Sequence, residues 1–228
     1  MLANRTGKPL VQHVYERARQ ARLPERVLIA TDDDRIARAV KAFGGEAVMT
    51  RRDHSNGTSR IAEVAATLEA PIIVNVQGDE PEMEPHNIDL AIETLINHPE
   101  CPVATVASPF EADEDQSSAN VVKVVLDSRG RALYFSRAAI PFDRDKAGVN
   151  RLKHVGLYVY RREFLAQYVG LPPMPLERAE QLEQLRILEN GFDIAVAIGA
   201  SRSQGIDTPE QYEAFVQRAN RKAPALRS

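Results

Sequence analysis

The chain has 228 residues, 43% of them hydrophobic and 27% charged, and a formal net charge of −3, so it suits a globular domain and lacks the general basic field of a nucleic-acid-binding protein. Its one cysteine, Cys101, excludes an internal disulfide and a cysteine-based zinc site, which favours the cytoplasm, and no apolar run approaches the ~18 residues of a membrane span. We expect a single domain at residues 1–221 and a disordered tail at 222–228.

Short runs of branched residues alternate with segments of helical periodicity along the whole chain. Strands are predicted at 27–30, 47–49, 72–76, 103–106, 121–126, 155–160 and 194–198. Apolar residues recur every three or four positions, as in a helix, at 10–18, 36–43, 61–68 and 176–188. This alternation predicts an α/β fold with a mostly parallel sheet and helices on both faces. Ligands of such sheets bind beyond the carboxyl ends of the strands.

The first polar segment with chemical promise is DHSNGTSR at 53–60, between a predicted strand and a predicted helix. Its small residues, Gly57 among them, expose backbone N–H groups at the positive end of a helix, which suits an anion or a nucleobase edge. Arg51 and Arg52 add positive charge just before it. The alternative is a structural helix start, with Thr58 as the N-cap residue.

The stretch VNVQGDEP at 74–81 ends a predicted strand in polar residues, including Gln77 and Asp79. Such a run is often only a turn whose aspartate caps the next helix. Here the next helical segment begins later, near 85–87, so capping does not readily explain Asp79. The sequence therefore places the end of this strand in a candidate ligand cleft.

The run KHVGLYVY at 153–160 alternates His154, Gly156, Tyr158 and Tyr160 onto one face of a strand. This polar, aromatic face is either exposed to solvent or lines a sugar pocket. In the second case Arg137, at the end of the segment ALYFSR at 132–137, could bind a carboxylate through two N–H groups of its guanidinium group.

The segment GIDTPE at 205–210 places Asp207 before a predicted helix start. Taken alone, Asp207 or Thr208 is best explained as a helix cap. Taken with Asp79, it raises the alternative that two carboxylates share a hard divalent cation. Mg²⁺ fits this alternative, because it prefers few carboxylates together with water and phosphate oxygens.

Eight segments in order resemble the cytidylyltransferases that activate acidic sugars, and most closely those that act on 3-deoxy-manno-octulosonate (KDO). They begin at Ala30 (ATDD), Thr50 (TRRDHSNGTSRIAE), Val74 (VNVQGDEP), Asn120 (NVVKVVLD), Ala132 (ALYFSRAAIPFDRD), Lys153 (KHVGLYVYRREF), Leu182 (LEQLRILENG) and Gly205 (GIDTPEQYE). The resemblance extends from 10 to about 216. It implies a Rossmann-like fold of the nucleotide-diphospho-sugar transferase type, with a small β-rich excursion around 120–160.

The resemblance also implies a reaction, in which the anomeric hydroxyl of KDO attacks the α-phosphorus of CTP to give CMP-KDO and pyrophosphate for lipopolysaccharide assembly. Its catalytic residues and Mg²⁺ ligands match Asp79 and Asp207, and its nucleotide-binding residues match Arg51, Asn56, Gly57, Thr58 and Gln77. Its sugar-acid pocket matches Gln77, Arg137, His154, Tyr158, Glu183 and Gln184. Without the resemblance, Glu183 and Gln184 would be assigned to a solvated helix face.

The resemblance further implies a homodimer in the cytoplasm. Two alternatives stay open, which are a cytidylyltransferase for another sugar acid, such as neuraminate or an amino-KDO, and an inactive remnant that binds without transferring. The family begins with an apolar strand and a loop of the form R-x-x-S-x-R-L-P-G-K, neither of which is found here; Gly7-Lys8-Pro9 matches a later Gly-Lys-Pro. We therefore expect an N-terminal truncation that leaves the chain poorly stable and nearly inactive.

Overall fold

The computed structural model describes residues 1–54, 56–201 and 205–222. The tail expected at 222–228 lies outside the described residues, apart from Lys222 at the end of the last helix. Among the described residues, no helix combines the length and the apolar character that crossing a bilayer requires.

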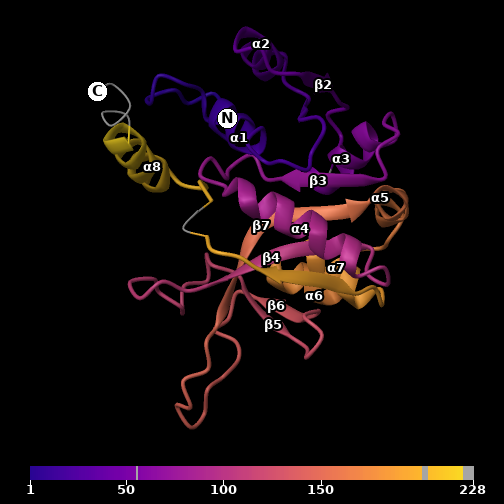
Figure 1. Cartoon of the computed structure of the whole chain (residues 1–228), viewed down its shortest axis with the longest axis vertical. Helices are drawn as coiled ribbons and strands as arrows, with labels where there is room; N and C mark the ends of the chain where they lie inside the picture. Colours follow the sequence, from indigo (N-terminus) through magenta and orange to yellow (C-terminus); the bar gives the residue numbers. More distant parts are fainter. Residues whose placement is uncertain (55, 202–204, 223–228) are drawn as a thin grey trace.

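Helices and strands alternate through the first half of the chain, as the sequence predicts (Figure 1). The helices are α1 Leu10–Ala18, α2 Asp34–Ala42, α3 Gly57–Ala65, α4 Pro85–Asn97, α5 Arg162–Val169, α6 Pro175–Glu180, α7 Gln184–Glu189 and α8 Pro209–Lys222. The strands are β1 Ile29–Thr31, β2 Ala47–Met49, β3 Ile72–Val76, β4 Val103–Pro109, β5 Lys123–Leu126, β6 Ala132–Ser136, β7 Leu152–Arg161 and β8 Ile194–Ile198.

The long helix predicted at 176–188 is wrong, because two short helices, α6 and α7, occupy this segment. Gln181 ends α6 in the left-handed region, with φ of 54°, and so breaks the helical hydrogen-bond series. The turn allows Leu182 and Leu185 to bury their side chains, while Arg186 forms an ion pair with Glu177 across it.

The strands form a six-stranded sheet and a separate parallel pair, β1 with β2. In the larger sheet the order is β6-β5-β7-β4-β8, and β3 also pairs with β7. The α/β class is confirmed, but pairing is not mostly parallel. Strand β7 runs antiparallel to β3, β4 and β5, and only β4 with β8 is parallel in this sheet. The reason is that β7 returns through the sheet between β3 and β4.

Hydrophobic side chains cover both faces of the six-stranded sheet. On one face α4 supplies Ile88 and Leu95 to a core that includes Leu157 and Val159 of β7. On the other face α3, α5 and α7 contribute to a core that includes Tyr158 and Tyr160 of the same strand. The predicted alternation of β7 side chains is therefore observed. The β5–β6 hairpin lies at the lower part of the sheet in Figure 1, and the loop between β6 and β7 extends below it, within the segment where the β-rich excursion is expected.

His154 of β7 is packed among aromatic rings. Its imidazole lies 5.3 Å from the Phe135 ring and 5.1 Å from the Tyr158 ring, and its Nε2 is 2.9 Å from Thr105 Oγ1. The Thr105 hydroxyl donates its one proton to Leu157 O at 2.5 Å, so it accepts from His154 Nε2–H. Burial lowers the pKa of His154 to about 4, which keeps the ring neutral.

This environment predicts a pH dependence of stability. Between pH 6.5 and about 4 the unfolded chain binds a proton at His154 that the folded chain does not, so the free energy of unfolding decreases as pH falls through this window. We expect a loss of roughly 2–3 kcal/mol. In His154→Gln, which can still donate to Thr105, the loss should be smaller by that amount. Urea denaturation of both proteins at a series of pH values measures the difference, and parallel curves would refute the assignment.

Candidate active site

The turn that follows β3 lies against Gly156 of β7. Gln77 N donates to Gly156 O at 3.3 Å, and Glu80 N donates to Gln77 O at 3.2 Å to close the turn. A Cβ atom at Gly156 would lie 2.9 Å from Glu80 Oε1, so a side chain there would require the Glu80 carboxylate to shift. The glycine in β7 therefore permits the close approach of the Glu80 side chain to the strand.

Asp207 reaches this turn because the segment before α8 docks on it. Ile206 N donates to Asp79 O at 2.9 Å, and a Cβ at Gly205 would lie 3.3 Å from Asp79 Oδ2. Burial and then the charge of Asp207 raise the pKa of Asp79. The structure thus brings together the two carboxylates that the sequence places 128 positions apart (207 − 79 = 128).

The cap of α8 does not use Asp207. Thr208 Oγ1 accepts from Gln211 N at 3.3 Å, and Gln211 Oε1 accepts from the backbone N–H groups of Thr208, at 2.9 Å, and Asp207, at 2.8 Å. This is a capping box. Since Thr208 caps the helix, the carboxylate of Asp207 is left for another role.

The residues present fit a hard divalent cation. Among the described residues there is no cluster of three or more metal-ligating side chains. Two carboxylates, Asp79 and Asp207, are nevertheless the small donor set that Mg²⁺ uses when a substrate phosphate and water complete its shell. The charge of Asp207 contributes to the raised pKa of Asp79.

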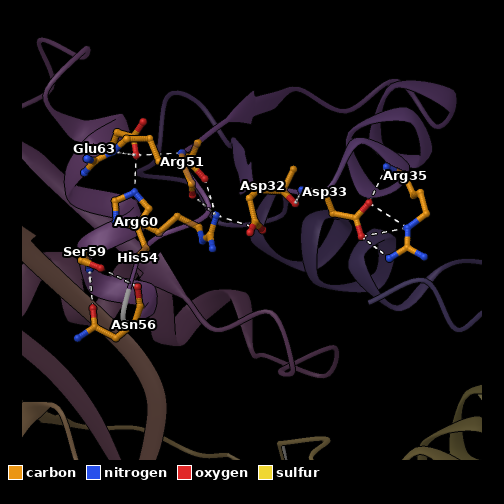
Figure 2. Close-up of polar contacts among 11 residues, drawn as sticks. Asp32, Asp33, Arg35, Arg51, His54, Asn56, Ser59, Arg60 and Glu63 are labelled. Atoms are coloured by element: carbon orange, nitrogen blue, oxygen red, sulfur yellow. Dashed lines mark hydrogen bonds and ion pairs between the residues drawn. The ribbon is translucent and has the colours of Figure 1, made fainter.

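The segment between β2 and α3 carries the residues expected on the nucleotide side (Figure 2). Asn56 Oδ1 accepts from Ser59 N at 2.8 Å, so Asn56 caps α3 and the alternative with Thr58 as the cap is wrong. Thr58 lies inside α3 and donates from its hydroxyl to Glu183 Oε2 at 2.8 Å. Gly57 faces the turn after β3, since its Cβ position is 3.9 Å from Gln77 Oε1.

The sequence analysis missed three charged residues that hold this segment in place, which are Asp32, Arg60 and Glu63 (Figure 2). Glu63 of α3 contacts His54 through a short hydrogen bond and accepts from Arg51 N at 3.3 Å. Arg60, also on α3, donates to Thr50 Oγ1 at 2.5 Å and forms an ion pair with Asp32 at 3.2 Å. Arg60 therefore ties the ends of β1 and β2 to α3. The Arg51 guanidinium group stays exposed, at the solvent-facing rim of this segment.

An open pocket of about 480 Å³ adjoins this segment on the β1 side. Its lining is charged and comprises Asp32, Asp33, Asp34, Arg35, Arg38 and Arg52. Asp33 caps α2 and pairs with Arg35, so part of this charge has a structural use.

The α6–α7 corner lies beside the aromatic face of β7, where the sugar-acid residues are expected. Gln184 is only 5% exposed, and burial raises the pKa of Glu183. The interpretation of these two residues as a solvated helix face is therefore wrong. Through Thr58, Glu183 joins this corner to the nucleotide side.

A buried amide, Asn75 of β3, faces the same region and was missed in the sequence analysis. It pairs in register with Tyr158, and its side-chain Nδ2 has no hydrogen-bond partner among the described residues. A polar residue inside the apolar run IIVNV was the signal that could have identified it.

Arg137 follows β6 directly and is held by backbone carbonyls. Its Nε donates to Glu180 O at 2.8 Å and its Nη1 to Ala119 O at 3.0 Å. A guanidinium group has five N–H donors, so three remain for a ligand. Phe135, two residues earlier, contacts His154, which places the end of β6 beside the expected sugar-acid face.

Comparison with known proteins agrees with these features. A cytidylyltransferase family model matches residues 2–194. The 3-deoxy-manno-octulosonate cytidylyltransferase of Geobacter sulfurreducens is 53% identical, covering 95% of this chain and 91% of its own. The protein of that name from Syntrophobacter fumaroxidans is 52% identical, covering 92% and 86%.

Solved structures give the same result. A CMP:2-keto-3-deoxy-manno-octonic acid synthetase complexed with CTP superposes with a TM-score of 0.91 at 43% identity, covering 97% of this chain and 91% of the other. A putative glucose-1-phosphate thymidylyltransferase from Bacillus anthracis, 11% identical, covering 92% of this chain and 82% of its own, has a TM-score of 0.64 and shows the shared fold alone. This chain therefore belongs to the cytidylyltransferase family, among the 3-deoxy-manno-octulosonate cytidylyltransferases.

Proposed function

We propose that this protein transfers CMP from CTP to KDO and releases pyrophosphate, a step that supplies activated KDO for lipopolysaccharide assembly. The observation that carries the proposal is the docking of Gly205 and Ile206 on the turn after β3, which sets Asp207 beside Asp79 at the end of the sheet. The single cysteine, Cys101, is buried and free, which fits a reducing compartment such as the cytoplasm.

Asp79 and Asp207 are the residues that would hold Mg²⁺. When bound there, the ion neutralises charge on the α-phosphate and orients the attacking hydroxyl. The bond that forms joins the anomeric oxygen of KDO to the α-phosphorus, and the bond that breaks is the anhydride to the β-phosphate. The hydroxyl proton passes to water, and pyrophosphate leaves with the electron pair of the broken P–O bond.

The nucleotide is assigned to the start of α3 and the segment before it. The N–H groups of Gly57 and Thr58 lie at the positive end of α3, which favours an anion or a base edge. Arg51 supplies charge from the rim, and Asn56 presents its side-chain amide beside them while its oxygen caps the helix. Gln77 lies between this region and the sugar.

The sugar acid is assigned to the aromatic face of β7 and the α6–α7 corner. Arg137 has three N–H donors left for the carboxylate. Neutral His154 uses Nε2–H on Thr105, so its Nδ1 can accept from a sugar hydroxyl. The remaining positions, Gln77, Tyr158, Glu183 and Gln184, would bind further hydroxyl groups.

We expect the protein to be a homodimer. The β-rich excursion exposes large apolar side chains, with Phe142 85% exposed and Leu133 and Val149 also largely exposed. Exposed large apolar side chains on one segment favour an interface, and a second copy is the partner that symmetry makes simplest. Light scattering on the wild type and on Phe142→Ser measures this state.

Removal of either acidic side chain should abolish turnover without harming the fold. We expect Asp79→Asn and Asp207→Asn to lower kcat by about a thousandfold or more, because charge on the α-phosphate is no longer neutralised. Removal of Mg²⁺ with EDTA should have the same effect on the wild type. Burial and the charge of Asp207 disfavour the charged form of Asp79, so metal-free Asp79→Asn should melt no lower than wild type.

Asp193→Asn is the matched control, since Asp193 forms an ion pair with Arg131 away from this turn. Pyrophosphate release with CTP, KDO and Mg²⁺ measures the rates. Near-normal turnover in either active-site variant would show that the substituted aspartate has no part in the reaction.

A panel of sugar acids tests the substrate assignment. We expect KDO to give the highest kcat/KM, ahead of neuraminate and an amino-KDO. Arg137→Lys should raise the KM for KDO by roughly 10- to 100-fold and leave the KM for CTP unchanged, because one charged, forked hydrogen-bonding group is lost. Faster turnover of another acid would assign the protein to that substrate, and calorimetric binding without turnover would indicate an inactive remnant.

The contacts that Arg60 makes predict an effect on the KM for CTP that is separate from the KM for KDO. Arg60→Met loses the contacts with Asp32 and Thr50, so the KM for CTP should increase by about tenfold while that for KDO stays unchanged. Arg35→Met, which breaks the exposed pair with Asp33, serves as the control. Equal changes in both KM values would mean that Arg60 only stabilises the fold.

A further inference from the structure

Lys123 of β5 is fully buried, yet no described carboxylate forms an ion pair with it. Its Nζ donates to three backbone carbonyls, those of Ser118 at 2.8 Å, Val121 at 2.6 Å and, through a short bond, Arg137. An ammonium group has three N–H donors and a neutral amine only two, so three acceptors match the charged form. Burial lowers the pKa of Lys123, and the nearby charges of Asp115 and Glu180 oppose this effect.

Arg137 stands where the regular strand hydrogen bonds end, because Lys123 opposite Ser136 is the last pair in the register of β5 with β6. Side chains take the place of a strand partner. Glu180 Oε2 accepts from Arg137 N at 2.9 Å, Glu180 O accepts from Arg137 Nε at 2.8 Å, and Lys123 binds Arg137 O. Both backbone polar atoms of Arg137 and one side of its guanidinium group are thus fixed by two residues.

The two buried lysines near this point, Lys123 and Lys153, differ in their charged partners. Lys153 of β7 lies opposite Lys123 in the register of the two strands and is buried as well, but it forms an ion pair with Glu114. The nearby charges of Asp115 and Glu180 favour the charged form of Lys123, and the charge of Arg137 disfavours it. An incoming carboxylate would be attracted by Arg137 and Lys123 together, whereas Lys153 is already paired with Glu114.

We propose that Lys123 and Glu180 are positioning residues, which fix Arg137 so that its free N–H groups face the carboxylate of the sugar acid. Lys123 also adds positive charge behind Arg137. The inference deepens the proposed function and rests on the role assigned there to Arg137.

The test is a double-mutant cycle between Lys123 and Arg137. Lys123→Met keeps the length of the buried side chain and removes its charge and donors, and we expect it to raise the KM for KDO by about tenfold with the KM for CTP unchanged. In an Arg137→Ala background the same substitution should change the KM for KDO by less than about twofold. Lys153→Met is the matched control, which should lower the melting temperature and leave the KM for KDO unchanged.

Glu180→Gln provides the second variant if Lys123→Met does not fold. It should likewise raise the KM for KDO and leave the KM for CTP unchanged. A readout independent of turnover is the Arg137 Nε–H proton, assigned by its loss in Arg137→Ala, whose exchange with solvent should become faster in either variant. An unchanged KM for KDO, or full additivity with Arg137→Ala, would overturn the inference while the proposed function stands. An Arg137→Ala protein with a normal KM for KDO would overturn both the inference and the assigned role of Arg137.

Discussion

The hydrogen bonding of β7 to three other strands is the constraint on which the site depends. Because β7 pairs antiparallel with β3, β4 and β5, its alternating side chains are fixed to opposite faces, with Leu157 in one core and Tyr158 in the other. The register with β4 shifts between Thr105 and Val106, close to Gly156, where the turn after β3 approaches. One strand therefore positions both the acidic turn and the aromatic face expected to bind the sugar.

Charged groups are held partly or wholly out of water at two places in the fold. The charge of Asp207 adds to burial in raising the pKa of Asp79 at the end of the sheet, and Lys123 is fully buried behind Arg137, with Asp115 and Glu180 as the nearby carboxylates that favour its charged form. Each arrangement costs stability, because a charged group is held out of water. In the proposed function, the first place binds a cation and the second binds a carboxylate. Stability and binding are thus opposed within the same residues.

Strand β6 was missed, but the other seven described strands could be predicted from the sequence, because branched residues mark the strands and polar residues mark their carboxyl ends. The pairing direction could not, since it depends on the return of β7 between β3 and β4. The break at Gln181 also escaped prediction, because a left-handed residue leaves the apolar periodicity nearly unchanged. The partners Thr58 and Glu183 lie 125 positions apart, and Arg137 and Glu180 lie 43 apart, so only the folded chain brings each pair together.

At two places around the site, structural tasks fall to the neighbours of the residues assigned to ligands. Thr208 caps α8, which leaves the carboxylate of Asp207 free of that task. The Glu180 carboxylate holds the backbone N–H of Arg137, while the carbonyls of Glu180 and Ala119 take only two of the five guanidinium N–H groups, which leaves three for a ligand. A sequence motif contains structural residues and ligand-binding residues side by side, and it does not distinguish between them. The hydrogen bonds separate them, because a side chain that satisfies a helix end or a backbone amide has less capacity left for a substrate.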